Sequence, residues 1–114
     1  MNIQELATIQ RLNLPVKILI LNNGYLGMVR QWQQLFWERR YSHTDLSDNP
    51  DFIRIAEAYG IKAMAIDEPG KIASVLEEAV TYPGPVLIDA RIEREANVYP
   101  MVPAGEALDN IILK

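Results

Sequence analysis

A short apolar run that ends in two asparagines constrains the fold of this chain more than any other feature. Residues 16–21 read Val-Lys-Ile-Leu-Ile-Leu and lead directly into Asn22 and Asn23. A strand that is nearly all apolar is expected where both faces of a parallel sheet are covered. In open α/β sheets, ligands bind just beyond the carboxyl ends of the strands. The sequence therefore predicts a buried parallel strand whose carboxyl end carries polar residues.

The Asn22-Asn23-Gly24 sequence after this strand has two physical interpretations. Amide oxygens and a flexible backbone suit a hard cation such as Mg²⁺. Asparagine followed by glycine also forms ordinary tight turns that need no ligand. The residues alone favour the turn, and metal binding is the alternative.

Strands and helices are predicted to alternate along the rest of the chain. Strands are expected at 16–21, 62–66 and 86–92, and helices at 2–12, 25–38, from Asn49-Pro50-Asp51 to Gly60, and at 69–82. In the last helix, apolar residues recur at i, i+3, i+4, i+7 and i+8, which is the pattern of one buried face. Alternating strands and helices imply right-handed parallel βαβ units. The prediction is an α/β fold of three layers, a parallel sheet with flanking helices.

Composition excludes several classes of protein. The 114 residues are 49% hydrophobic, which suits one small globular domain. Eleven Lys and Arg against fifteen Asp and Glu leave a net charge of -4 without a basic stripe, which argues against nucleic acid. The absence of cysteine excludes disulfides and thiolate metal sites, and no apolar run is long enough to span a bilayer. We therefore expect a cytoplasmic protein with neither a nucleic-acid nor a membrane partner.

Four segments in order resemble the acetolactate synthase catalytic (large) subunit family. They are Met1–Ile9, Leu14–Lys17, the stretch Ile18–Trp32 and Asn97–Pro103. Within them, Asn22-Asn23 is similar to the second half of the thiamine diphosphate motif, in which Asn-Asn follows Gly-Asp-Gly at a fixed distance. The resemblance implies that residues 1–92 are the C-terminal part of a thiamine-diphosphate-binding domain and that 93–114 form a C-terminal arm. It also implies that the chain is a fragment, with Gly-Asp-Gly upstream of Met1.

The resemblance also implies roles for particular residues. The side-chain oxygen of Asn23 and the backbone carbonyl of Tyr25 would bind Mg²⁺, and Asn22 would hold the turn. Trp32 would line the substrate channel, which the arm approaches at Ala104. The implied cofactor-binding residues are Tyr25, Leu26, Gly27 and Met28. For Leu26 and Met28, the alternative is a role as plain core residues.

No residue of the chain is predicted to be catalytic, because the general acid-base glutamate of thiamine enzymes lies in another domain. His43 is the only histidine and lies in a polar loop, so we expect a solvated loop residue. Phe36 and Trp37 are expected to be packing residues.

The function implied by the resemblance is that of a thiamine-diphosphate-dependent synthase in branched-chain amino-acid biosynthesis. It would decarboxylate pyruvate and join the two-carbon unit to a second 2-oxo acid, with Mg²⁺ and, in absent domains, an optional FAD. A homo-oligomer is expected, the family allows a regulatory subunit, and the fragment alone would be inactive. The alternatives are another thiamine-dependent decarboxylase or oxidase, and a stand-alone α/β interaction module.

Overall fold

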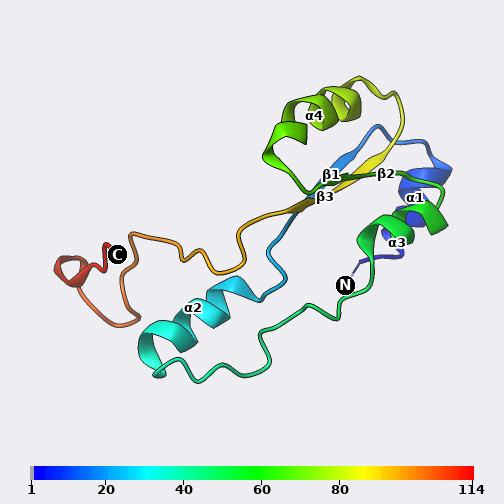
Figure 1. Cartoon of the computed structure of the whole chain (residues 1–114). Coiled ribbons are helices and arrows are strands. Elements are labelled where there is room, and N and C mark those ends of the chain that lie inside the picture. The colour runs from blue at the N-terminus through cyan, green and yellow to red at the C-terminus, as the bar shows by residue number, and fades with distance from the viewer. Residues whose placement is uncertain (1) are drawn as a thin grey trace. The chain divides into compact units, whose positions relative to one another are not determined.

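The computed structural model describes residues 2–114, in which four α-helices and three strands are formed (Figure 1). The chain divides into two compact units. The first is made of Met1–Asn23 and Asp48–Ile92, and the second of Gly24–Ser47 and Glu93–Lys114. The first unit contains α1 (Glu5–Arg11), β1 (Lys17–Asn22), α3 (Phe52–Ala58), β2 (Lys62–Ile66), α4 (Ile72–Thr81) and β3 (Val86–Arg91). The second contains α2 (Gly27–Phe36).

The first unit is built on a three-stranded parallel sheet in the order β1-β3-β2. Val86 of the central strand is paired in register with Lys17 on one side and with Lys62 on the other. Because successive side chains of a strand point to opposite faces, β3 supplies two separate cores. The predicted parallel sheet is confirmed.

Helices cover both faces of this sheet (Figure 1). On one face, Ala79 of α4 packs in a buried cluster with Ile66, Val86, Ile88 and Ala90. On the other face, α1 and α3 pack over Leu87, and the buried residues are Leu6, Ala56, Ile61 and Leu87. The three-layer α/β prediction is therefore confirmed.

The helix over residues 52–58 begins differently from the prediction. The first residue of the predicted Asn49-Pro50-Asp51 start, Asn49, would be the capping residue, but the N-cap is Asp51. Its side chain accepts hydrogen bonds from the backbone amides of Ile53 and Arg54 at 2.9 and 3.1 Å. The predicted end is confirmed, since Gly60 has a left-handed backbone with φ +72°.

The other helices are shorter than predicted. In the segment expected as one helix over 69–82, Pro69–Lys71 forms a short 3-10 helix before α4 begins at Ile72. Short 3-10 turns are frequent at helix starts. Residues 39–48 form the predicted loop, with no helix or strand assigned.

In the second unit, α2 is flanked by two largely irregular segments, 37–47 and 93–114. The first of these pairs with the residues before the helix, since Tyr25 and Asp45 form an antiparallel bridge. The other folds back on itself through a bridge between Met101 and Ile112. No helix within residues 2–114 has the length and apolar character needed to cross a membrane.

Candidate functional site

A side-chain hydrogen bond connects the carboxyl end of β1 to the central strand, β3. The amide of Asn22 donates from Nδ2 to Oδ2 of Asp89 over 3.3 Å. Asp89 is only 8% exposed, and its other oxygen, Oδ1, has no hydrogen-bond partner within residues 2–114. The resemblance implies that Asn22 holds the turn, and this bond also connects it to the sheet. Asp89 was missed, although a carboxylate inside an apolar strand was a visible signal.

Asn23 follows at the end of this unit, and Gly24 after it has a left-handed backbone with φ +68°, as tight turns require. Within residues 2–114, no three His, Cys, Asp or Glu side chains gather into a metal site. The Asn23 amide oxygen and the Tyr25 backbone carbonyl have the hard-donor chemistry that suits Mg²⁺.

In the second unit, the ring of Tyr25 lies close to two guanidinium groups. The Arg30 guanidinium is 5.2 Å from the ring centroid and that of Arg94 is 4.6 Å away. Both distances are within the range of a cation–π interaction. Arg30 is only 5% exposed, and it forms an ion pair with Glu95 at 2.8 Å. Neither arginine was identified by a periodic pattern or a motif.

The loop that pairs with Tyr25 is fixed by a carboxylate. Ser47 donates its backbone amide to Oδ1 of Asp45 over 2.8 Å, and Arg94 approaches the same carboxylate at 3.4 Å. Hydrogen bonding from Ser47, and to a smaller degree the charge of Arg94, lowers the pKa of Asp45 below its ordinary value. His43 in this loop is exposed, as predicted.

Two glutamines of α2 bind the two irregular segments through their amides. Gln31 donates to the Val98 carbonyl at 2.9 Å and accepts from the Val98 amide at 2.7 Å. Gln33 makes the same pair of bonds with Ser42, at 3.0 and 3.1 Å. Gln31 is only 1% exposed. Sequence analysis missed both glutamines, because each partner is an irregular segment without a pattern of its own.

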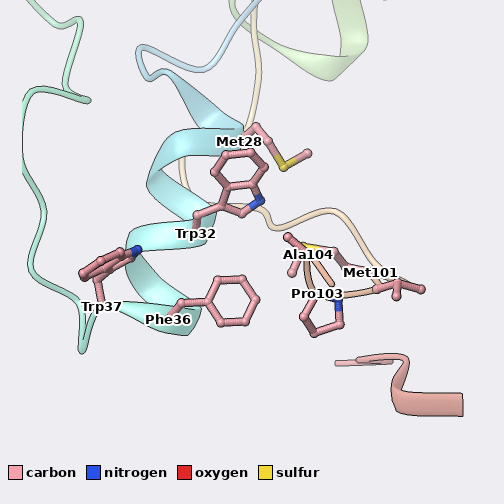
Figure 2. Close-up of a pocket in the computed structure, with 8 residues that line it drawn as sticks. Met28, Trp32, Phe36, Trp37, Met101, Pro103 and Ala104 are labelled. Carbon is pink, nitrogen blue, oxygen red and sulfur yellow. The ribbon is translucent and has the colours of Figure 1, made fainter. Parts of the chain in front are cut away.

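An apolar pocket of about 440 Å³ lies between α2 and the C-terminal segment (Figure 2). Its lining residues are Met28, Trp32, Phe36, Trp37, Met101, Val102, Pro103 and Ala104. Figure 2 shows Met28, Trp32 and Phe36 on the side of α2 that faces residues 101–104. The structure thus brings Trp32 together with Ala104, which the resemblance had placed at the channel.

Exposure corrects one expectation about the aromatic residues. Phe36 is 45% exposed and Trp37 is 61% exposed, so they are pocket-lining rather than packing residues. Leu26 and Met28 are also exposed, so neither is a core residue of this unit.

The fold and the polar strand end correspond to a known class of cofactor domain. Residues 1–90 match the family described as "Thiamine pyrophosphate enzyme, C-terminal TPP binding domain". The chain belongs to this family. A solved structure of the class, a thiamine diphosphate-dependent 4-hydroxybenzoylformate decarboxylase of Rhodococcus jostii RHA1, aligns with a TM-score of 0.72 and 27% identity. That alignment covers 80% of this chain and 17% of the other.

Within the class, the chain is similar to acetolactate synthase large subunits. It is 51% identical over 108 residues to that of Pyropia yezoensis, an alignment that covers 94% of this chain and 18% of the relative. Identity to the isozyme 2 large subunit of Escherichia coli K12 is 45% over 114 residues, 100% of this chain and 21% of the relative. The mitochondrial acetolactate synthase catalytic subunit of Saccharomyces cerevisiae is 46% identical over 112 residues. That alignment covers 98% of this chain and 16% of the relative. The chain thus spans about a fifth of the length of these curated relatives.

Proposed function

We propose that this chain forms part of the cofactor domain of an acetolactate synthase in branched-chain amino-acid biosynthesis. The whole enzyme decarboxylates pyruvate and joins the two-carbon unit to a second 2-oxo acid. The observation that carries this proposal is 45% identity to an acetolactate synthase large subunit over all 114 residues. Thiamine diphosphate, when bound, supplies the carbanion chemistry, and the protein binds and orients it.

In this proposal, the residues after β1 hold the metal and the cofactor. The Asn23 side-chain oxygen and the Tyr25 backbone carbonyl bind Mg²⁺, whose charge balances that of the diphosphate. Leu26, Gly27 and Met28 contact the cofactor. The exposure of Leu26 and Met28 supports this role, because both side chains are accessible within their unit.

Trp32 forms part of the wall of the substrate channel. Its place beside residues 101–104 in an apolar pocket supports this assignment. Binding sites for small organic molecules are mostly apolar hollows of this kind. The residues of this chain therefore bind and orient the cofactor and cover the substrate channel. No residue described here is assigned a proton-transfer role.

The wider assembly is part of the same proposal. The enzyme is cytoplasmic and homo-oligomeric, its substrates are small 2-oxo acids, and a regulatory subunit and an FAD bind outside this chain where the enzyme has them. The competing functions are another thiamine-dependent decarboxylase or oxidase and a stand-alone α/β interaction module.

An assay of the full-length protein with pyruvate, thiamine diphosphate and Mg²⁺ separates these functions. Cofactor-dependent formation of acetolactate is the expected result. Release of an aldehyde without a condensation product would identify a decarboxylase instead. Absence of cofactor binding, together with an upstream coding sequence that lacks Gly-Asp-Gly, would favour the interaction module.

A further inference from the structure

The side-chain amide of Gln31 pairs with the backbone of Val98 in the way that two residues of neighbouring β-strands pair. One amide group exchanges both N–H···O bonds with one backbone residue, at 2.9 and 2.7 Å, as two residues do in an antiparallel ladder. The Gln31 amide also lies 3.2 Å from the sulfur of Met101. Gln31 is only 1% exposed, so on its side these bonds are shielded from water, whereas Val98 is largely exposed.

We propose that Gln31 is a positioning residue that holds the arm segment 97–104 in place as the second wall of the Trp32 pocket. The substrate consequence rests on the proposed function: loss of the Gln31 amide changes which 2-oxo acid the site prefers as its second substrate.

Apolar burial in this arm segment is concentrated at Met101, Val102 and Pro103, which are half-buried. Val98 itself is 61% exposed, so little of it is removed from water. Ala104 at the far end of the segment is small and exposed. The ion pair of Arg30 with Glu95 anchors the chain upstream, but the Glu95 side chain is itself largely exposed. The two hydrogen bonds of Gln31 are therefore the direct polar attachment of the arm to α2 next to the pocket.

Gln33 provides a matched control inside the same helix. It makes the same two bonds to the backbone of Ser42, in the loop on the other side of α2. Residues two apart on an α-helix point in roughly opposite directions. The same substitution at the two glutamines therefore releases different segments.

The test uses the full-length enzyme with Gln31→Met or Gln33→Met, since methionine keeps the length of the side chain and removes both bonds. Hydrogen exchange followed by mass spectrometry is compared for peptides covering 97–103 and 41–45. Two neutral hydrogen bonds correspond to about a tenfold or greater increase in local opening. We expect this increase at 97–103 only in Gln31→Met and at 41–45 only in Gln33→Met.

The functional measurement is competition between two second substrates, 2-oxo acids that differ by one methylene. We expect the product ratio to change about threefold or more in Gln31→Met and to stay at the wild-type value in Gln33→Met. Cofactor affinity is measured in parallel and should remain within about twofold of wild type in Gln31→Met, because the arm makes no cofactor contact in this assignment.

A second variant covers the case in which Gln31→Met does not fold. Val98→Pro removes the backbone N–H that donates to Gln31 and leaves α2 unaltered. Faster exchange at 99–103 with the changed product ratio supports the proposal. Unchanged exchange at 97–103 in both variants, or the same product ratio as wild type, overturns it. If the wild-type enzyme forms no condensation product, the proposed function fails, while the exchange result still decides whether Gln31 holds the arm.

Discussion

At the scale of residues, Asn22 at the end of β1 and Asn23 after it have different surroundings, so their replacement should have different effects. In the full-length enzyme, Asn23→Ala should weaken Mg²⁺-dependent cofactor binding, because it removes a proposed oxygen ligand. Asn22→Ala should mainly lower the free energy of unfolding, by about 1–3 kcal/mol, because buried Asp89 loses a donor at 3.3 Å. Cofactor titration and urea unfolding of both variants measure the two effects separately.

Trp32→Leu is a third variant for the same cofactor titration. It should leave cofactor affinity nearly intact and change substrate selectivity, because Trp32 lines the apolar pocket and is assigned no ligand role. Equal cofactor affinity for Asn22→Ala and Asn23→Ala would show that Asn23 is not a metal ligand.

Two of the pairs that sequence patterns did not reveal are far apart in the chain. Gln31 and Val98 are 67 positions apart in the chain, and so are Asn22 and Asp89. Motifs and periodicity depend on residues that are near one another in sequence. A resemblance therefore pointed to roles for Asn23 and Trp32, but no sequence pattern pointed to these pairs. The role of a buried polar residue on a helix depends on its hydrogen-bond partner, and only the fold shows which residue that partner is.

At the scale of elements, the start of α3 allows a direct test of which residue caps it. Asp51→Ala should lower the free energy of unfolding by about 0.5–2 kcal/mol, because two backbone amides lose their acceptor. Asn49→Ala, two positions earlier, should change it by less than about 0.5 kcal/mol, as surface substitutions usually do. Denaturant unfolding of the two variants gives the comparison, and a larger effect at Asn49 would contradict the assigned cap.

The loop before α3 should loosen only at low pH. The pKa of Asp45 is lowered in the folded chain, chiefly by hydrogen bonding from Ser47, so folding favours the carboxylate. Its contribution is therefore complete above the unfolded value, about 3.9, and is lost as the pH falls through the lower folded value. Carboxyl NMR titration should find Asp45 below the ordinary value, and Ser47→Pro should raise it by removing the amide donor. An unchanged titration in Ser47→Pro would contradict this cause.

The boundaries of the elements show which sequence signals were sufficient. The strand predicted at 62–66 was correct at both ends, and the other two strands were correct within one residue, because β-type apolar runs end abruptly at polar or proline residues. The helices were predicted too long, since an apolar face continues into residues that form caps and 3-10 turns, as at Pro69. Periodicity identifies a helix well, whereas its ends depend on local hydrogen bonds.

At the scale of the whole molecule, the sheet of the first unit keeps an apolar area beside β1. Leu19 and Leu21 of the edge strand are exposed, and so are Ile72, Leu76 and Val80 along one side of α4. Leu19, Leu21, Ile72 and Leu76 also line one hollow of this unit. An area of this kind, here called the β1 patch, is typical of a surface that contacts another protein segment.

The 114-residue chain on its own should therefore associate in solution. The prediction is a dimer or larger species by light scattering, because removing apolar surface from water gives roughly 25 cal/mol per Å². Leu21→Gln combined with Val80→Gln should shift the population toward monomer, since these side chains of the β1 patch are 63% and 73% exposed. Leu12→Gln is the matched control, because Leu12 is equally exposed at 62% but is outside the β1 patch. A monomeric wild-type chain at high concentration, or equal dissociation by the control, would show that the β1 patch does not drive association.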